Sequence, residues 1–140
     1  MGNTLWIESR GRPRAETQRD LSILGKLDRE LDKLAMRLGV TTLSSFYDDS
    51  VLIESYAELA EEAAVKAESP VPKWFDSIKG LETIKALRDR LQNDFGEVNW
   101  RPEKSKQHWP QHLLDEMKFC QAVLEDAVAQ EQQFRLLIVP

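Results

Sequence analysis

The sequence has 140 residues, of which 41% are hydrophobic and 31% are charged, and its formal net charge is -5. This length fits one globular domain over residues 1–140 with a core that folds without disulfides, in agreement with the single Cys120. The acidic balance argues against nucleic-acid and anionic-membrane binding, because both need clustered Lys and Arg in excess. The amino-terminal residues lack a secretory signal, and no apolar run is long enough to span a membrane. We therefore expect a cytoplasmic protein.

Both ends of the sequence have the composition of β-strands. Residues 4–8 combine aromatic and β-branched side chains, and residues 136–139 form an unbroken apolar run. An exposed apolar terminus would promote aggregation, so we expect it to pair with the amino-terminal strand and to be covered by helices. The direction of pairing stays open, because a parallel crossover and an antiparallel pair both fit.

Amphipathic segments between the two strands predict helices. These segments cover residues 21–38, 51 or 55 to 67, 77 to about 95, and 109 to about 130. Asp20 is placed to cap the first helix, Gly39 to end it, and Asp76 to cap the third. Residues 98–100 are a candidate for a short third strand. The sequence thus predicts an α+β domain, with about four helices packed on a small sheet formed by the terminal strands.

The most basic segment of the sequence is the predicted loop at residues 9–20. Guanidinium groups bind phosphate or carboxylate in a bidentate manner, so this loop is a candidate anion-binding site. Its candidate ligands are Arg10, Arg12 and Arg14. The alternative is a solvated loop whose arginines pair with nearby acids such as Glu16, or with the acidic helix face of residues 54–68.

One pair of side chains has the spacing of metal ligands. His112 and Glu116 lie one helical turn apart and can supply two ligands to a site completed elsewhere. Cys120 continues the line, but eight residues of helix span about 12 Å, too far for one ion. The alternative is that Cys120 packs in the core. Asp48 and Asp49 are interpreted as turn or cap residues, and the sequence predicts no catalytic residue and no cofactor.

Aromatic and acidic residues in the middle of the chain are candidates for partner binding. Trp74 and Trp100 lie in or beside connections, where they either anchor a partner or pin helices to the core. Glu61 and Glu62 belong to an acidic helix face that suits a basic surface. The sequence favours a noncatalytic protein-interaction module, such as a regulator, adaptor or immunity-like protein. The alternative is a small protein that binds an anionic ligand or a metal, possibly an enzyme, and the oligomeric state stays open.

Three segments together carry a resemblance. Trp74-Phe75-Asp76, His108-Trp109-Pro110 and the closing residues 134–140 are similar to segments of small bacterial proteins of unknown function. The resemblance covers mostly the second half of the chain. It implies no functional residues, so the candidate sites above depend on the chemistry of the residues themselves.

Overall fold

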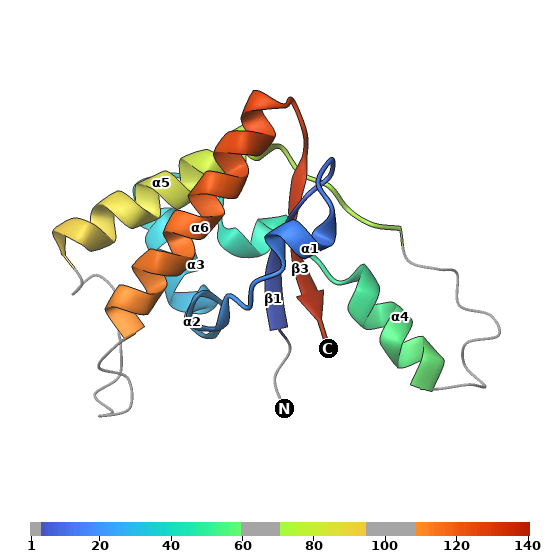
Figure 1. Ribbon diagram of the computed structural model, residues 1–140. Helices are drawn as coiled ribbons and strands as arrows, with labels where there is room; N and C mark the ends of the chain where they lie inside the picture. Colours follow the sequence, from blue (N-terminus) through green and yellow to red (C-terminus); the bar gives the residue numbers. More distant parts are fainter. Residues whose placement is uncertain (1–3, 60–70, 95–108) are drawn as a thin grey trace.

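A computed structural model describes residues 4–59, 71–94 and 109–140, with the backbone alone described for 55–59. Within these residues the chain forms an α+β fold, as predicted (Figure 1). The strands are β1 (Thr4–Ser9), β2 (Tyr47–Asp48) and β3 (Phe134–Val139). The helices are α1 (Arg14–Thr17), α2 (Ser22–Lys26), α3 (Asp28–Leu38), the 3-10 helix η1 (Leu43–Phe46), α4 (Ser50–Leu59), α5 (Ser77–Asn93) and α6 (Trp109–Ala129).

The two terminal strands pair with each other, which confirms the central prediction. β1 and β3 are antiparallel, with Thr4 opposite Val139 and Ser9 opposite Phe134. β2 joins the other edge of β3 in parallel, so the strand order is β1-β3-β2. β2 is not predicted by the sequence, because a strand of two residues in a polar connection has no detectable periodicity.

The sheet has a core face and a second face, both covered. Leu5, Ile7 and Leu136 belong to the hydrophobic core, and Figure 1 shows α2, α3, α5 and α6 gathered on one side of the strands, with α4 on the other. Successive residues of a strand point to opposite faces. Glu8 and Arg135, which are register partners, therefore share the second face.

The helices differ from the prediction at three places. The described residues contain six α-helices instead of about four, because α1 lies inside the predicted loop and the predicted helix 21–38 is divided at Leu27. Leu27 is both the C-cap of α2 and the N-cap of α3, with φ -103° and ψ 12°. Asp20 does not cap α2, whose N-cap is Leu21 without a side-chain hydrogen bond. Gly39 ends α3 with φ 75°, as predicted.

The amide groups at the start of α2 are instead satisfied from another helix. Glu116 of α6 accepts hydrogen bonds from the backbone N–H groups of Ile23 at 3.3 Å and Leu24 at 2.8 Å. This long-range cap fixes the start of α2 against α6. No local sequence signal predicts it, because Glu116 is 92 residues from Leu24.

Close packing between α5 and the sheet depends on a glycine. A Cβ atom at Gly80 would lie 2.3 Å from Cζ of Phe134, so the ring occupies the space that a side chain would need. Asp76 caps α5 by accepting a hydrogen bond from Ile78 N at 2.9 Å, which confirms that prediction. Among the described helices, none combines the length and apolar character needed to cross a membrane.

Candidate functional site

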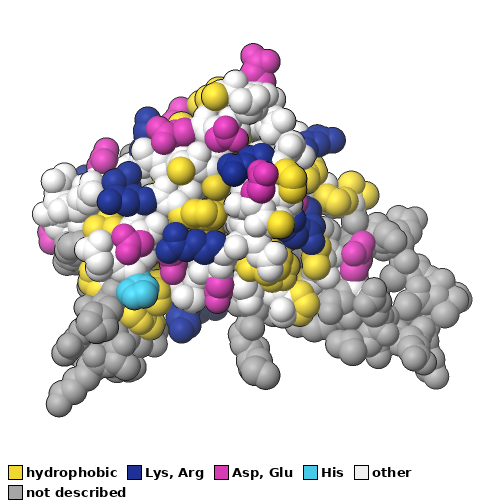
Figure 2. Space-filling view, viewed as in Figure 1, with side chains coloured by type: hydrophobic (Ala, Val, Ile, Leu, Met, Phe, Trp, Pro, Cys, Tyr) yellow, Lys and Arg dark blue, Asp and Glu magenta, His cyan; other side chains and the backbone are white. Residues whose placement is uncertain are grey.

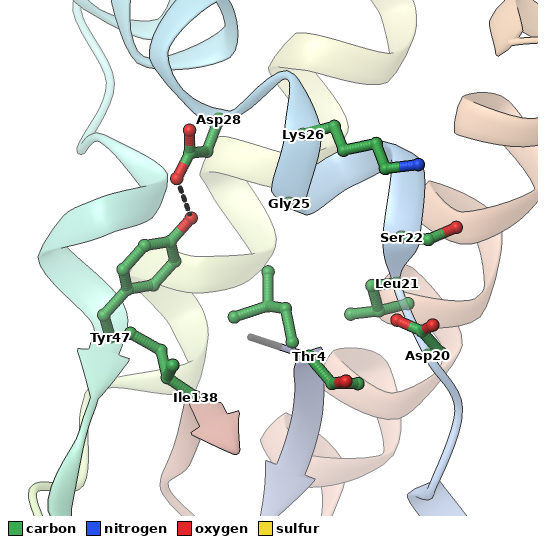
Figure 3. A pocket seen from close by; sticks show the side chains of 10 residues that line it. Thr4, Asp20, Leu21, Ser22, Gly25, Lys26, Asp28, Tyr47 and Ile138 are labelled. Atoms are coloured by element: carbon green, nitrogen blue, oxygen red, sulfur yellow. Dashed lines mark hydrogen bonds between the residues drawn. The ribbon is translucent and has the colours of Figure 1, made fainter. Parts of the chain in front are cut away.

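A pocket of about 520 Å³ opens where the end of the sheet meets α2. We call it the α2 pocket, and Figure 3 shows most of its lining side chains. The lining residues are Thr4, Leu5, Asp20, Leu21, Ser22, Gly25, Lys26, Asp28, Tyr47 and Ile138. This volume lies within the usual range for small-ligand sites, which combine an apolar wall with a few polar groups.

The apolar part of the α2 pocket comes from three separate elements. Leu5 belongs to β1, Ile138 to β3, and Leu21 directly precedes α2. The backbone N–H of Leu21 donates to the carbonyl of Leu5 at 2.9 Å, which fastens the start of α2 to the edge of the sheet. We call this apolar part the floor of the pocket. Because Leu5 and Leu21 are buried, the floor belongs to the close-packed core and keeps its shape.

One side of the pocket carries a hydrogen-bonded acid. The Tyr47 hydroxyl donates to Oδ2 of Asp28 at 2.9 Å (Figure 3). Burial raises the pKa of Tyr47 well above its usual value, and the nearby Asp28 carboxylate raises it further. The phenol therefore stays protonated as a donor and orients the carboxylate. Asp28 is also in the first turn of α3, where a negative charge is favourable.

The other polar groups lie across the pocket. Figure 3 shows Asp20 and Ser22 on the side opposite Asp28 and Tyr47. The Lys26 ammonium is 5.6 Å from the centre of the Trp109 ring, a cation–π contact, and it points away from Asp28. The rim thus has carboxylates on two sides, and its cation is directed toward α6.

The three candidate arginines of the anion-binding hypothesis have separate partners. Arg10 Nη1 donates to the Gln133 side chain at 3.0 Å, and Arg12 Nε donates to Glu16 at 3.2 Å. Arg14 Nε donates to Oε2 of Glu8 at 2.7 Å. The structure therefore does not gather the three guanidinium groups at one centre, and the pairing of Arg12 with Glu16 follows the alternative interpretation.

A buried cluster of charges occupies the second face of the sheet. Arg135 donates to Oε1 of Glu8 through Nε at 3.1 Å and Nη2 at 2.7 Å, and through Nη1 to Asp48. Asp48 also accepts hydrogen bonds from the backbone N–H and the hydroxyl of Ser50 at 3.1 and 3.0 Å, the contact expected of a turn residue before α4. These contacts join all three strands, and Arg14 and Ser50 extend them to α1 and α4. We call Glu8, Asp48 and Arg135 the sheet charge cluster.

Trp74, a candidate partner anchor, covers the sheet charge cluster. Its ring centre is 4.5 Å from the Arg135 guanidinium carbon and 5.8 Å from that of Arg10. The side chain is half-buried, so this contact favours the structural interpretation of Trp74. Trp100, Glu61 and Glu62 lie outside the described residues, as does the candidate strand at 98–100.

The candidate metal ligands face different surroundings. His112 is exposed, whereas Glu116 is buried and its two oxygens accept the α2 amide groups. Burial raises the pKa of Glu116, and the hydrogen bonds from Leu24 and Ile23 oppose that effect. Within the described chain, no three His, Cys, Asp or Glu side chains are grouped as a metal site. Cys120 is fully buried, and burial raises its pKa to about 12, so it remains a thiol in the core.

Comparisons with known proteins add no family assignment. No family model, no curated protein and no solved structure matches the chain.

On the face shown in Figure 2, acidic and basic side chains are interspersed with apolar ones. The α2 pocket therefore provides the most specific arrangement of chemical groups from which to infer function.

Sequence reasoning missed the α2 pocket because its walls come from distant segments. Asp20 is predicted only as a helix cap, and no local motif marks Asp28 or Tyr47 as a site residue. The available signal was Gly25, a glycine inside a leucine-rich helical pattern where alanine is more favourable. The sequence marks that position as unusual, but only the fold places it beside β1.

Proposed function

We propose that the protein is a noncatalytic cytoplasmic interaction module that binds a basic partner protein. The observation that carries this proposal is the α2 pocket, where Asp20 and Asp28 lie on opposite sides of an apolar floor. Such a site suits a basic side chain, whose aliphatic stem packs on apolar groups while its charged head meets a carboxylate.

The buried ionisable groups have structural tasks, which supports a binding role over a catalytic one. Glu8, Asp48 and Arg135 hold the three strands together through their mutual ion pairs. Glu116 caps α2, and the raised pKa of Cys120 keeps that side chain in its neutral form. Each of these groups has a structural task in the folded state, and a nucleophile needs an accessible, activated group instead.

The overall charge supports a basic partner. A net charge of -5 attracts cationic surfaces over a distance of about one Debye length, roughly 8 to 10 Å at physiological salt. Electrostatic attraction of this kind raises association rates and is weakened by salt. The binding of the partner should therefore fall steeply as the salt concentration rises.

A pull-down from native cells with matched variants tests the proposal. The wild type should retain a basic protein in a salt-sensitive manner, and Asp20→Asn with Asp28→Asn should lose it. Glu82→Gln with Asp89→Asn is the control, because both residues are exposed on α5 and the charge change is the same. Equal recovery by both double variants would contradict the proposal.

The acidic helix face predicted from the sequence needs its own arm of this experiment. Charge reversal by Glu61→Lys with Glu62→Lys should reduce retention of the same basic protein if that face contributes to binding. Full retention by this variant, together with loss in the Asp20 and Asp28 variant, would restrict the binding surface to the α2 pocket.

A further inference from the structure

We infer that the α2 pocket accepts a linear aliphatic chain with an ammonium group at each end. This inference deepens the proposed function and rests on it for the biological use of the site. The same chemistry has two sources, a free diamine and the amino-terminal lysine of a partner protein. In cadaverine, as in an amino-terminal lysine, five carbon atoms separate the two nitrogen atoms.

The arrangement of charge in the pocket fits two cationic ends. Asp28 and Asp20 lie on opposite sides of the pocket (Figure 3). Leu5, Leu21 and Ile138 supply its apolar lining. A methylene chain removes apolar area of the floor from water, at roughly 0.8 kcal/mol per buried CH₂ group. A ligand with one ammonium would meet one carboxylate and leave the other solvated.

The Asp28 carboxylate is oriented before a ligand arrives. Tyr47 holds Oδ2 of Asp28 at 2.9 Å, and Asp28 is partly buried at the first turn of α3. The rigid position of this oxygen reduces the conformational entropy that binding would otherwise cost. The Lys26 ammonium is 5.6 Å from the centre of the Trp109 ring and points to the side of the pocket that carries Asp20 and Ser22, so it does not oppose a cation bound at Asp28 (Figure 3).

Gly25 provides an independent observation. A Cβ atom there would contact Leu5 Cβ at 3.6 Å, an ordinary van der Waals distance, so packing does not require glycine. Glycine inside a helix is less favourable than alanine. Gly80 shows the contrast, since a Cβ there would lie 2.3 Å from Phe134 Cζ. A side chain at Gly25 would extend over the floor of the pocket, and the glycine keeps this space open for a ligand.

Calorimetric titration of the full chain with three small probes tests the inference. Cadaverine should bind, and the dicarboxylate glutarate should not. The monoamine n-pentylamine should bind about fivefold more weakly than cadaverine, which corresponds to the loss of one exposed ion pair. Amide chemical shifts should change around Leu5 and Gly25. L-lysinamide represents an amino-terminal lysine, so its binding assigns the site to a partner protein, and binding of cadaverine alone assigns it to free diamines.

Variants separate recognition in the pocket from nonspecific attraction. Asp28→Asn should reduce the affinity for cadaverine about fivefold, whereas Asp89→Asn on α5 should leave it unchanged. Tyr47→Phe keeps the carboxylate but removes the hydrogen bond that orients it, so cadaverine should still bind with a lower affinity. Gly25→Leu should block binding. Circular dichroism confirms that each variant is folded. Absence of cadaverine binding, or equal binding by wild type, Asp28→Asn and Gly25→Leu, would overturn the inference.

The two proposals fail in different ways. Loss of a basic partner from the Asp20 and Asp28 double variant without any binding of cadaverine would overturn the diammonium inference and retain the interaction function. Pocket-specific binding of cadaverine, combined with partner recovery that ignores both carboxylates, would retain the inference and overturn the proposed use of the pocket for partner binding.

Discussion

Replacement of Arg135 should be far more damaging than replacement of Arg14, although both arginines bind the same carboxylate. The side chain of Arg135 is 5% exposed and that of Arg14 is 47% exposed, and each places a guanidinium nitrogen 2.7 Å from a Glu8 oxygen. Arg135→Ala leaves Glu8 and Asp48 without their shared cation in the interior. Arg14→Ala breaks an ion pair that water can largely replace.

The expected magnitudes follow from this difference in burial. Loss of one partner from a buried ion pair costs about 3 to 5 kcal/mol. Glu8 keeps Arg14 and Asp48 keeps Ser50, so we expect Arg135→Ala to lie near the lower end, at about 3 kcal/mol. An exposed pair contributes about 1 kcal/mol or less, which sets the expectation for Arg14→Ala.

Urea unfolding followed by far-UV circular dichroism and tryptophan fluorescence measures both values. Equal m-values for the variants are required for the comparison. A triple variant with Glu8→Gln, Asp48→Asn and Arg135→Met removes the charges together and should recover much of the lost stability, because no charge remains buried alone. If Arg135→Ala costs no more than Arg14→Ala, the sheet charge cluster is not desolvated as described.

Further results are expected for two glycines, for Cys120 and for β3. Gly80→Ala should lower the free energy of unfolding by about 1 to 3 kcal/mol, because the new methyl group overlaps Phe134. Gly25→Ala should raise the free energy of unfolding by up to about 1 kcal/mol. Calorimetric unfolding measures both values, and the opposite ranking would contradict the packing described at the two glycines. Iodoacetamide at about pH 8 should modify Cys120 in urea but not in the native protein. The Cys120 thiol has a pKa of about 12 in the folded protein and of 9.0 in the unfolded chain. The unfolded state therefore loses this proton first, and the free energy of unfolding should fall as the pH rises above 9.0. This fall should be larger in the wild type than in Cys120→Ala. Deletion of residues 135–140 removes most of β3 and should abolish cooperative unfolding, and a soluble, cooperatively folded truncation would refute the central position of that strand.

Local patterns predicted the parts of the fold that local forces stabilise. The spacing of leucines before Gly39 and the Asp76 cap identified helical segments, and the apolar run at residues 136–139 identified the last strand. The division at Leu27 and the strand β2 escaped this reasoning. The cap of α2 by Glu116 and the pairing of β2 with β3 also depend on partners distant in sequence.

The candidate sites illustrate the same limit. The sequence grouped Arg10, Arg12 and Arg14 because they are neighbours along the chain, yet the fold gives each a different partner. It grouped His112 with Glu116 by helical spacing, and the fold uses Glu116 to cap α2. Proximity along the chain indicates which groups are available, whereas the fold determines what each one contacts.

Composition and periodicity by themselves determined the α+β fold class and the pairing of the terminal strands, because apolar strands and amphipathic helices must bury their apolar sides wherever they lie. Only the tertiary structure decided that Asp20, Asp28 and Tyr47 surround one pocket and that Glu8, Asp48 and Arg135 form one cluster. Burial depends on the pattern of each segment taken separately. Convergence of polar groups depends on how β1, β2, β3 and α2 are placed in three dimensions, and no single segment encodes that placement.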